Sequence, residues 1–292
     1  PPPPPHFFFN PPQGIGDCCL SRGLGDVYKR QILDTLDELG IADNTYVVFT
    51  SDNGGGFRGN QPLRGGKGNL LEGGLRMPSV VRGPGIEPGS YTTVPMVQWD
   101  FLQTFYDLAG GTEPLPADLD GGSLKDVWFN GDDGKVVRNT EELVFHFPWH
   151  TGVPESVIRV GDYKLRKNLD TLEYELYNVA NDLSEKKNLA SQMPEMVASL
   201  DKRRTEYLNK VNAETVTTTR RNYLAQLQGG WIENGEQRLA KLKAELAADP
   251  TNKQKAYAVD VSQNHVNFQA SQEEKCIRMI KLHEERGTAE TN

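Results

Sequence analysis

The chain has 292 residues, of which 37% are hydrophobic and 25% charged, and its formal net charge is −8. The length allows one large domain or two smaller ones, and the composition is typical of a globular protein. A negative net charge argues against a general nucleic-acid binder, although a few local cations could still hold a small anionic substrate. The sequence has no apolar run of about 18 residues, so no membrane span is predicted. Its three cysteines define no disulfide framework.

Residues 1–31 lack the composition of a folded segment. They begin with five prolines, soon followed by three consecutive phenylalanines, and have neither helical nor strand periodicity. They also lack the charged start and apolar core of a secretory signal. The stretch 18–31 resembles a translated sequencing adapter. We therefore expect residues 1–31 to be artefactual or disordered and exclude them from the predicted fold, with a native Pro-rich arm as the alternative.

From Ile32 onward the sequence has the patterns of an α/β domain, which we expect to extend over 32–141. The apolar spacing from Ile32 to Leu39 predicts a helix that ends at Gly40. The short apolar run 46–49 predicts a strand buried on both faces of a sheet, so helix and strand together indicate a βαβ-type arrangement. A glycine-rich loop at 54–74, a second strand at 78–81 and an amphipathic helix over 97–108 are predicted next.

A second, smaller unit is expected over 142–212. Short strand patterns separated by turns predict a small antiparallel sheet, and Gly161 followed by Asp162 is a hairpin signal between two of the strands. A helix from Pro194 to about Leu208 would close this sheet. The predicted strands are 143–145, 156–160, 163–165 and 174–177.

Residues 213–292 are predicted to form a polar, mostly helical tail. The leucines between 239 and 246 mark a short amphipathic helix that ends before Pro250, and Ile277 lies in a second helical pattern. The tail contains no residues with a recognisable chemical pattern.

A carboxylate and an amide follow the first predicted strand. Asp52 and Asn53 lie at its carboxyl end, where ligand sites of α/β sheets are found, and Gly54 and Gly55 come next. Two hard oxygen donors suit Ca²⁺ or Mg²⁺, and glycines let the backbone approach a ligand closely. On its own, Asp-Asn-Gly is also the pattern of an ordinary turn.

A single lysine lies among glycines in the predicted loop. Lys67, between Gly66 and Gly68, combines an ammonium group with neighbouring backbone N–H groups, which suits a tetrahedral anion such as sulfate or phosphate. The Walker pattern is not present, and a solvated lysine in a flexible loop is the alternative. Glu72 and Arg76 are expected to pair locally and hold the loop.

Together these motifs resemble the type I sulfatase family. Ser-Asp-Asn-Gly-Gly at 51–55, Gly-Gly-Lys-Gly at 65–68 and Glu-Gly-Gly-Leu-Arg-Met-Pro at 72–78 carry the resemblance, which covers about residues 32–212. It implies an alkaline-phosphatase-like α/β fold, with a sheet that has helices on both faces and is incomplete in this chain. A small C-terminal antiparallel sheet closed by a helix would follow.

The resemblance also implies an activity, namely metal-dependent hydrolysis of sulfate esters. In the family, the positions matching Asp52 and Asn53 bind a divalent cation, most often Ca²⁺, with Mg²⁺ as the alternative here. The position matching Lys67 contacts the sulfate group and acts in catalysis. Cation and lysine would neutralise the sulfate oxygens and stabilise the charge that grows in the transition state.

Two histidines are candidates for binding substrate. His146 and His150 flank Phe147, Pro148 and Trp149, and this segment resembles imperfectly a His-x-Pro-His element of related sulfatases. A histidine here could hydrogen-bond a sugar hydroxyl or a sulfate, which favours a sulfated glycan or small molecule as substrate. A structural aromatic turn is an equally good interpretation.

The family's nucleophile is a formylglycine, made from the first residue of a Cys/Ser-x-Pro/Ala-x-Arg motif, and no such motif follows Ile32. Cys18 lies four residues before Arg22, but Leu20 occupies the position that requires proline or alanine, so we reject Cys18 as the nucleophile. We therefore expect a gene fragment whose N-terminal half, with the formylglycine and further metal ligands, is missing. A sheet without its neighbours would leave an open edge, so the chain alone is predicted to be inactive and poorly soluble.

Two other functions are compatible with the same residues. One is a phosphate or phosphonate monoester hydrolase of the same superfamily, because phosphate and sulfate are both tetrahedral. The other is a non-catalytic protein that retains an anion or metal site. Sulfatases of this type are mostly periplasmic, secreted or lysosomal, so a periplasmic or secreted location is expected. The sequence gives no indication of oligomeric state.

Overall fold

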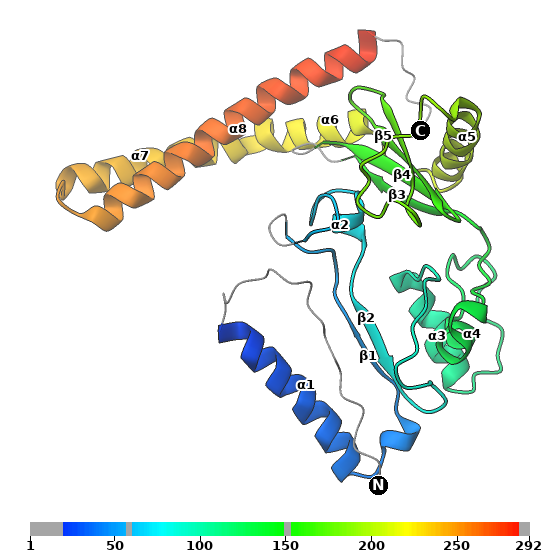
Figure 1. Cartoon of the computed structure of the whole chain (residues 1–292). Coiled ribbons are helices and arrows are strands. Elements are labelled where there is room, and N and C mark those ends of the chain that lie inside the picture. The colour runs from blue at the N-terminus through cyan, green and yellow to red at the C-terminus, as the bar shows by residue number, and fades with distance from the viewer. Residues whose placement is uncertain (1–19, 57–59, 149–152, 286–292) are drawn as a thin grey trace. The chain divides into compact units, whose positions relative to one another are not determined.

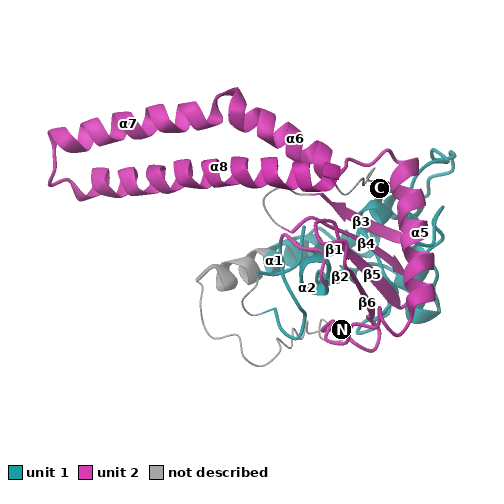
Figure 2. Ribbon diagram, turned by 90° about the horizontal axis from the view of Figure 1, so that it is seen from above, with its two compact units in different colours: residues 1–67, 72–142 teal, residues 68–71, 143–292 magenta. Residues whose placement is uncertain are grey.

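The structure is a computed structural model that describes residues 20–56, 60–148 and 153–285. The chain divides into two compact units, coloured separately in Figure 2. The first unit comprises 1–67 and 72–142, and the second comprises 68–71 and 143–292. The short segment 68–71 therefore packs with the second unit, although the residues on both sides of it belong to the first.

The first unit begins with a helix and a two-stranded sheet (Figure 1). Helix α1 covers Leu20–Glu38 and is followed by the 3₁₀ helix η1, Ala42–Asn44. Strands β1, Val47–Thr50, and β2, Ser79–Arg82, pair antiparallel. Helix α1 starts twelve residues before the predicted start at Ile32. Once a helix is nucleated, each residue added to it gains one backbone hydrogen bond, so the helix extends readily. A glycine with positive φ, Gly40, follows the helix as predicted.

The predicted burial of the first strand was wrong. We expected it to be covered on both faces in a βαβ arrangement, yet its residues are only partly buried and Phe49 is 38% exposed. The reason is that double-sided burial depends on neighbouring strands and helices. Among the described residues β1 pairs only with β2, in an antiparallel sheet of two.

The rest of the first unit is a small helical region. The predicted 97–108 helix is confirmed, with a 3₁₀ start, and Gly110 follows it with a positive φ. An ion pair of the fully buried Asp100 organises this region, since Asp100 accepts from Arg138 at 2.7 Å and from the N–H of Gly122 at 3.0 Å. The elements are α2 (Glu72–Leu75), η2 (Gln98–Asp100), α3 (Phe101–Leu108), α4 (Lys125–Asn130) and η3 (Gly131–Asp133).

The second unit contains the predicted antiparallel sheet. Its four strands follow one another in the order β3-β4-β5-β6, so each pairs with its sequence neighbour. Gly161 forms the hairpin between β4 and β5 with a φ of +55°, which confirms the turn signal. The strands are β3 (Leu143–Phe147), β4 (Glu155–Val160), β5 (Tyr163–Asn168) and β6 (Tyr174–Asn178).

Helix α5, Pro194–Lys210, covers one face of this sheet, as predicted (Figure 1). Ile158, Leu165 and Leu176 lie in register on β4, β5 and β6, are fully buried, and pack against Leu200 of the helix. Alternate residues along a strand point to opposite faces, so these positions define the face that meets α5.

A polar cluster on the same face ties α5 to the sheet. Asp201 accepts a hydrogen bond from the Tyr174 hydroxyl at 2.6 Å and pairs with the buried Arg204 at 2.7 Å. Arg204 also reaches the Ser156 hydroxyl on β4 at 3.3 Å. Burial alone would raise the pKa of Asp201, but the hydrogen bond from Tyr174 and the positive charge of Arg204 hold it below its ordinary value.

The tail is helical, as predicted, but longer and more regular than expected. Helix α6, Val216–Gln226, leads through the π-helical turn η4, Leu227–Trp231, into α7, Ile232–Ala248. Helix α8, Lys253–Glu285, then runs back antiparallel beside α7 (Figures 1 and 2). Across the described ranges, no helix is both long and apolar enough to span a bilayer.

A buried ionic cluster attaches the tail to the sheet. Arg220 of α6 lies 2.6 Å from Asp170, in the turn after β5, and His283 of α8 lies 3.5 Å from the same carboxylate. Arg220 and His283 are almost completely buried. Burial would raise the pKa of Asp170, but His283 and Arg220 lower it below its ordinary value.

Stability is predicted to fall in acid through these carboxylates. Because the folded pKa of Asp201 is depressed, its contribution is present above about pH 3.9, the unfolded value, and is lost as pH falls toward the folded pKa. In the complete product of the gene, Asp201→Asn should lower the unfolding temperature at about pH 7 and reduce the further loss seen on acidification to about pH 3. Calorimetry at both pH values measures this. An unchanged acid dependence would contradict it.

Candidate functional site

Three backbone hydrogen bonds fold the three glycine-rich motifs, 51–55, 65–68 and 72–78, onto one another. The N–H of Gly54 donates to the carbonyl of Gly74 at 2.9 Å, and the N–H of Lys67 donates to the carbonyl of Gly55 at 2.8 Å. The N–H of Gly73 donates to the carbonyl of Arg64 at 2.8 Å. The loop that carries Lys67 is therefore fixed by its own backbone to the residues that directly follow Asp52 and Asn53.

An asparagine that the sequence patterns did not single out completes this arrangement. The amide of Asn60 donates to the carbonyl of Gly73 at 2.7 Å and to that of Gly65 at 3.2 Å. One side chain thus holds two separate turns of the loop together. An asparagine inside a glycine-rich loop was the available signal, because its amide can satisfy backbone carbonyls that no strand or helix will pair.

Glycine is required where these backbones meet. A Cβ placed on Gly54 would lie 2.1 Å from the carbonyl oxygen of Gly73. A Cβ on Gly73 would lie 2.5 Å from the carbonyl oxygens of Arg64 and Gly65. The sequence predicted that these glycines let the backbone approach a ligand, whereas the close approach seen in the structure is to the neighbouring loop.

The charged side chains of the two motifs are exposed. Asp52 and Lys67 are both exposed and Asn53 is half-buried. The hydroxyl of Ser51 donates to the carbonyl of Asn53 at 3.0 Å, and Gln98 donates to the carbonyl of Ser51 at 3.2 Å. The turn after β1 is thus held by the side chains of Ser51 and Gln98, while the side chains of Asp52 and Lys67 are exposed.

The donor set fits part of a cation site. Asp52 and Asn53 offer a carboxylate and an amide oxygen on adjacent residues, and Ca²⁺ takes six to eight oxygen ligands. Within the part of the chain that the structure describes, no three His, Cys, Asp or Glu side chains gather into a metal site. These two residues could therefore provide only some of the ligands.

The local pairing predicted for Glu72 and Arg76 is confirmed. Nε of Arg76 lies 3.1 Å from the carboxylate of Glu72, which is itself 4% exposed. Glu72 opens helix α2, so a buried carboxylate at its first residue also faces the N-terminal dipole of that short helix. The pair fixes the end of the loop just before β2.

Of the two histidine candidates, the structure describes only His146. It lies on β3 opposite Ser156, and its Nε2 is 2.9 Å from the carbonyl oxygen of Glu214. His146 belongs to the second unit, whereas Asp52, Asn53 and Lys67 belong to the first. His150, Trp149 and the rejected Cys18 lie outside the described residues.

Comparison of this sequence with known proteins finds sulfatases. The model of the sulfatase family matches residues 28–111. The chain is 38% identical over 195 residues to a sulfatase from Formosa agariphila, a match that covers 60% of this chain and 35% of that protein. Over residues 28–111 this chain therefore matches the sulfatase family, and its matched relatives are sulfatases. The predicted type I sulfatase resemblance and its alkaline-phosphatase-like α/β fold are thereby confirmed.

Two further sulfatases are similar to this chain, one in sequence and one in structure. Rat steryl-sulfatase is 38% identical over 131 residues, covering 40% of this chain and 22% of that protein. The structure of BT4656 in complex with its substrate D-glucosamine-2-N,6-O-disulfate matches with a TM-score of 0.52 and 29% identity. That match covers 61% of this chain and 37% of BT4656. The chain thus spans little more than a third of the length of these relatives, or less.

The glycine contact yields a stability prediction. In the complete gene product, Gly54→Ala should lower the free energy of unfolding by about 1–3 kcal/mol, because the new methyl group collides with backbone that has nowhere to move. Urea denaturation measures the change. The matched control is Gly56→Ala, since a Cβ at Gly56 meets nothing within 4 Å and should change stability by less than about 0.5 kcal/mol. Equal effects of the two substitutions would contradict this account.

Proposed function

We propose that these residues form part of the active site of a sulfuric ester hydrolase that uses a divalent cation. The observation that carries the proposal is the 2.8 Å hydrogen bond from the N–H of Lys67 to the carbonyl of Gly55. It holds a cationic side chain on the same folded loop as the carboxylate and amide of Asp52 and Asn53. A sulfate ester needs both a cation and a lysine near its oxygens, because negative charge grows there as the bond to sulfur is exchanged.

Each residue has a separate role in this proposal. Asp52 and Asn53 would hold the cation, and Ca²⁺ suits them better than Mg²⁺ because a carboxylate and an amide oxygen on a turn fit its larger, more adaptable coordination sphere. The bound cation would act as a Lewis acid on the sulfate. Lys67 would orient the sulfate group and donate hydrogen bonds to the oxygens that gain charge in the transition state.

The nucleophile is proposed to lie in a part of the protein that these residues do not include. The sequence from Ile32 onward has no Cys/Ser-x-Pro/Ala-x-Arg motif, and the chain covers 35% of its Formosa relative. We therefore expect the chain alone to be inactive. Reading the gene upstream of the codon for Ile32 tests this directly, since a formylglycine motif well upstream supports the proposal and its absence overturns it.

A sulfated carbohydrate is the proposed substrate. BT4656, with 29% identity, was solved with a disulfated glucosamine as its substrate. His146 and His150 are proposed to make polar contacts with a sugar, and Trp149 between them a stacking contact. The steryl-sulfatase match favours a different class, so comparing hydrolysis of a glucosamine 6-sulfate and a steryl sulfate distinguishes the two. A periplasmic or secreted location is proposed on the basis of the family.

Loss of Lys67 should affect the transition state more than substrate binding. In the complete gene product, Lys67→Ala should lower kcat for 4-nitrophenyl sulfate by about 10²–10³, the usual effect of removing one donor to a developing anion. Lys202→Ala is the control, because Lys202 is an exposed lysine on α5, with 75% of its side chain accessible. A kcat within about twofold of the parent in Lys67→Ala would refute the role of Lys67. Faster hydrolysis of 4-nitrophenyl phosphate than of the sulfate would favour a phosphatase.

Removal of the cation should abolish activity reversibly. After dialysis against EDTA, activity should return on adding Ca²⁺, and Asp52→Ala should need at least about tenfold more Ca²⁺ for half-maximal recovery. Asp118→Ala is the matched control, since Asp118 is also an exposed aspartate of the first unit. Recovery curves that coincide for Asp52→Ala and the parent would remove Asp52 from the cation site.

A further inference from the structure

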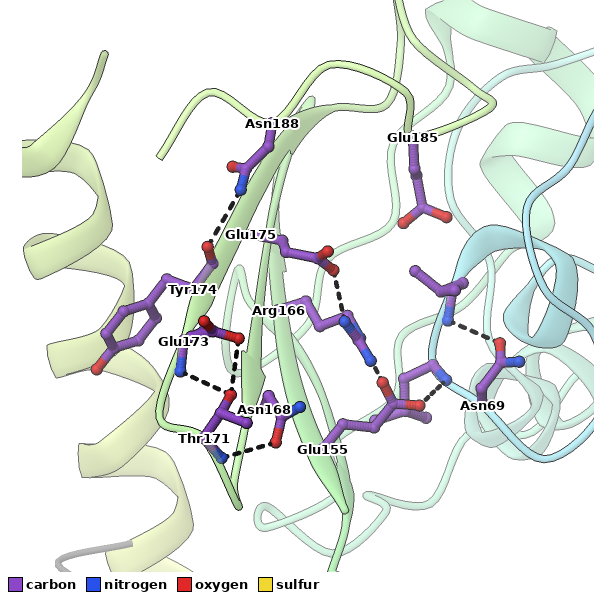
Figure 3. A network of polar contacts seen from close by, with 12 residues as sticks. Asn69, Glu155, Arg166, Asn168, Thr171, Glu173, Tyr174, Glu175, Glu185 and Asn188 are labelled. Carbon is purple, nitrogen blue, oxygen red and sulfur yellow. Dashed lines mark hydrogen bonds and ion pairs between the residues drawn. The ribbon is translucent and has the colours of Figure 1, made fainter. Parts of the chain in front are cut away.

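The residues directly after Lys67 are held by a buried carboxylate on the sheet of the second unit. Glu155, the first residue of β4, is 0% exposed, and its Oε1 accepts a hydrogen bond from the N–H of Leu70 at 2.6 Å. Asn69 accepts from the N–H of Leu71 at 3.2 Å and completes this turn (Figure 3). Segment 68–71 is grouped with the second unit, and the hydrogen bond from Leu70 to Glu155 joins it to the sheet of that unit.

Glu155 is itself held by an arginine whose position follows from strand register. Arg166 on β5 pairs with Val157 on β4, so it lies diagonally across from Glu155, on the same face of the sheet. Its Nε donates to Oε2 of Glu155, and its Nη1 donates to Glu175, directly opposite on β6. Figure 3 shows Glu175, Arg166 and Glu155 as a continuous chain across the strands.

The charges in this chain stabilise one another. Burial alone would lower the pKa of Arg166, but the carboxylates of Glu155 and Glu175 raise it above its ordinary value. The planar guanidinium binds both carboxylates with a fixed fork of donors, so it fixes the direction of the Glu155 side chain. With Oε2 occupied by Arg166, Oε1 is presented to the backbone of the loop.

This anchor lies close to Lys67 along the chain. Leu70 is the third residue after Lys67, so the two Cα atoms are at most about 11 Å apart. On its other side Lys67 is held by its own N–H, which donates to the carbonyl of Gly55. The lysine backbone is thus restrained from both directions, and only one of the two restraints uses a side chain.

We propose that Glu155, supported by Arg166, is a positioning residue for Lys67. This rests on the proposed role of Lys67 in binding the sulfate group. Glu155 touches no reacting atom. It fixes the loop after Lys67, so that the ammonium group stays where the transition state needs it and does not have to be ordered when substrate binds. Displacement of a catalytic group by about 1 Å can cost about 10²-fold in rate, so an anchor of this kind has a measurable effect.

The test combines kinetics with amide hydrogen exchange in the complete gene product. Glu155→Ala should raise the exchange rate of the Leu70 amide at least tenfold and lower kcat/KM for 4-nitrophenyl sulfate at least tenfold. Glu155→Gln should restore only part of both, because its one amide oxygen can accept the N–H of Leu70 only if its NH2 group faces Arg166. Asp201→Asn is the matched control: it breaks an ionic cluster on the opposite face of the same sheet and should leave both readouts within twofold of the parent.

The outcomes separate this inference from the proposed function. Unchanged exchange at Leu70 in Glu155→Ala overturns the anchor, and faster exchange with unchanged kcat/KM overturns its role in positioning Lys67. If the parent protein hydrolyses no sulfate ester, the exchange data still decide whether Glu155 holds the loop. Should Glu155→Ala fail to fold, Glu155→Leu combined with Arg166→Leu replaces the buried ion pair by apolar side chains and removes the same acceptor.

Discussion

The hydrogen bond between the N–H of Lys67 and the carbonyl of Gly55 is the contact on which the candidate site depends. It brings together two motifs that lie twelve residues apart and makes one folded loop of them. Beside this bond, glycine is needed where the backbones meet, because a Cβ on Gly54 would lie 2.1 Å from the carbonyl oxygen of Gly73. Asn60 and the pair of Glu72 with Arg76 then fix the remaining turns. The glycines therefore have a packing role first, and the charged groups are exposed as its consequence.

The sequence predicted best those elements whose contacts are local. The four-stranded sheet joins each strand to its neighbour in the chain, so alternating patterns and the Gly161 turn were sufficient to predict it. The α7 helix ends at Ala248, just before the predicted stop at Pro250. In contrast, α8 runs for 33 residues through a polar sequence, and its regularity depends on the helices beside it. The exposure of β1 was not predicted for the same reason, because burial of a strand is decided by elements distant in the sequence.

In the candidate site, too, the sequence predicted some residues and missed others whose role depends on distant contacts. Residue types and the combination of motifs predicted Asp52, Asn53 and Lys67, although each pattern alone is also compatible with a turn or a solvated loop. Asn60 and Glu155 were missed, since an asparagine and a strand glutamate carry no signal until the fold shows what they bind. Both bind backbone groups of the loop. The sequence thus predicted the groups proposed to meet a ligand, and the structure added the side chains that hold the loop in shape.

Ion pairs join separate segments of this chain, whose net charge is −8. Buried carboxylates pair with arginines in compact clusters, Asp100 with Arg138, Glu155 with Arg166, and Asp170 with Arg220, and the first and third of these join segments distant in the sequence. A buried charge is tolerated only with a partner, so each cluster fixes one relative placement of the segments it joins. Lys67 differs from these cations in being exposed, as expected for a group that binds an anion from solution.

The central claim is that one loop presents the cation ligands and the sulfate-binding lysine together. A crystal structure of the complete gene product with Ca²⁺ and a bound sulfate ester tests it most directly. The account predicts oxygens of Asp52 and Asn53 at about 2.3–2.6 Å from Ca²⁺ and the ammonium group of Lys67 within hydrogen-bonding distance of a sulfate oxygen. A cation and sulfate bound elsewhere, with Asp52 and Lys67 facing only solvent, would contradict it.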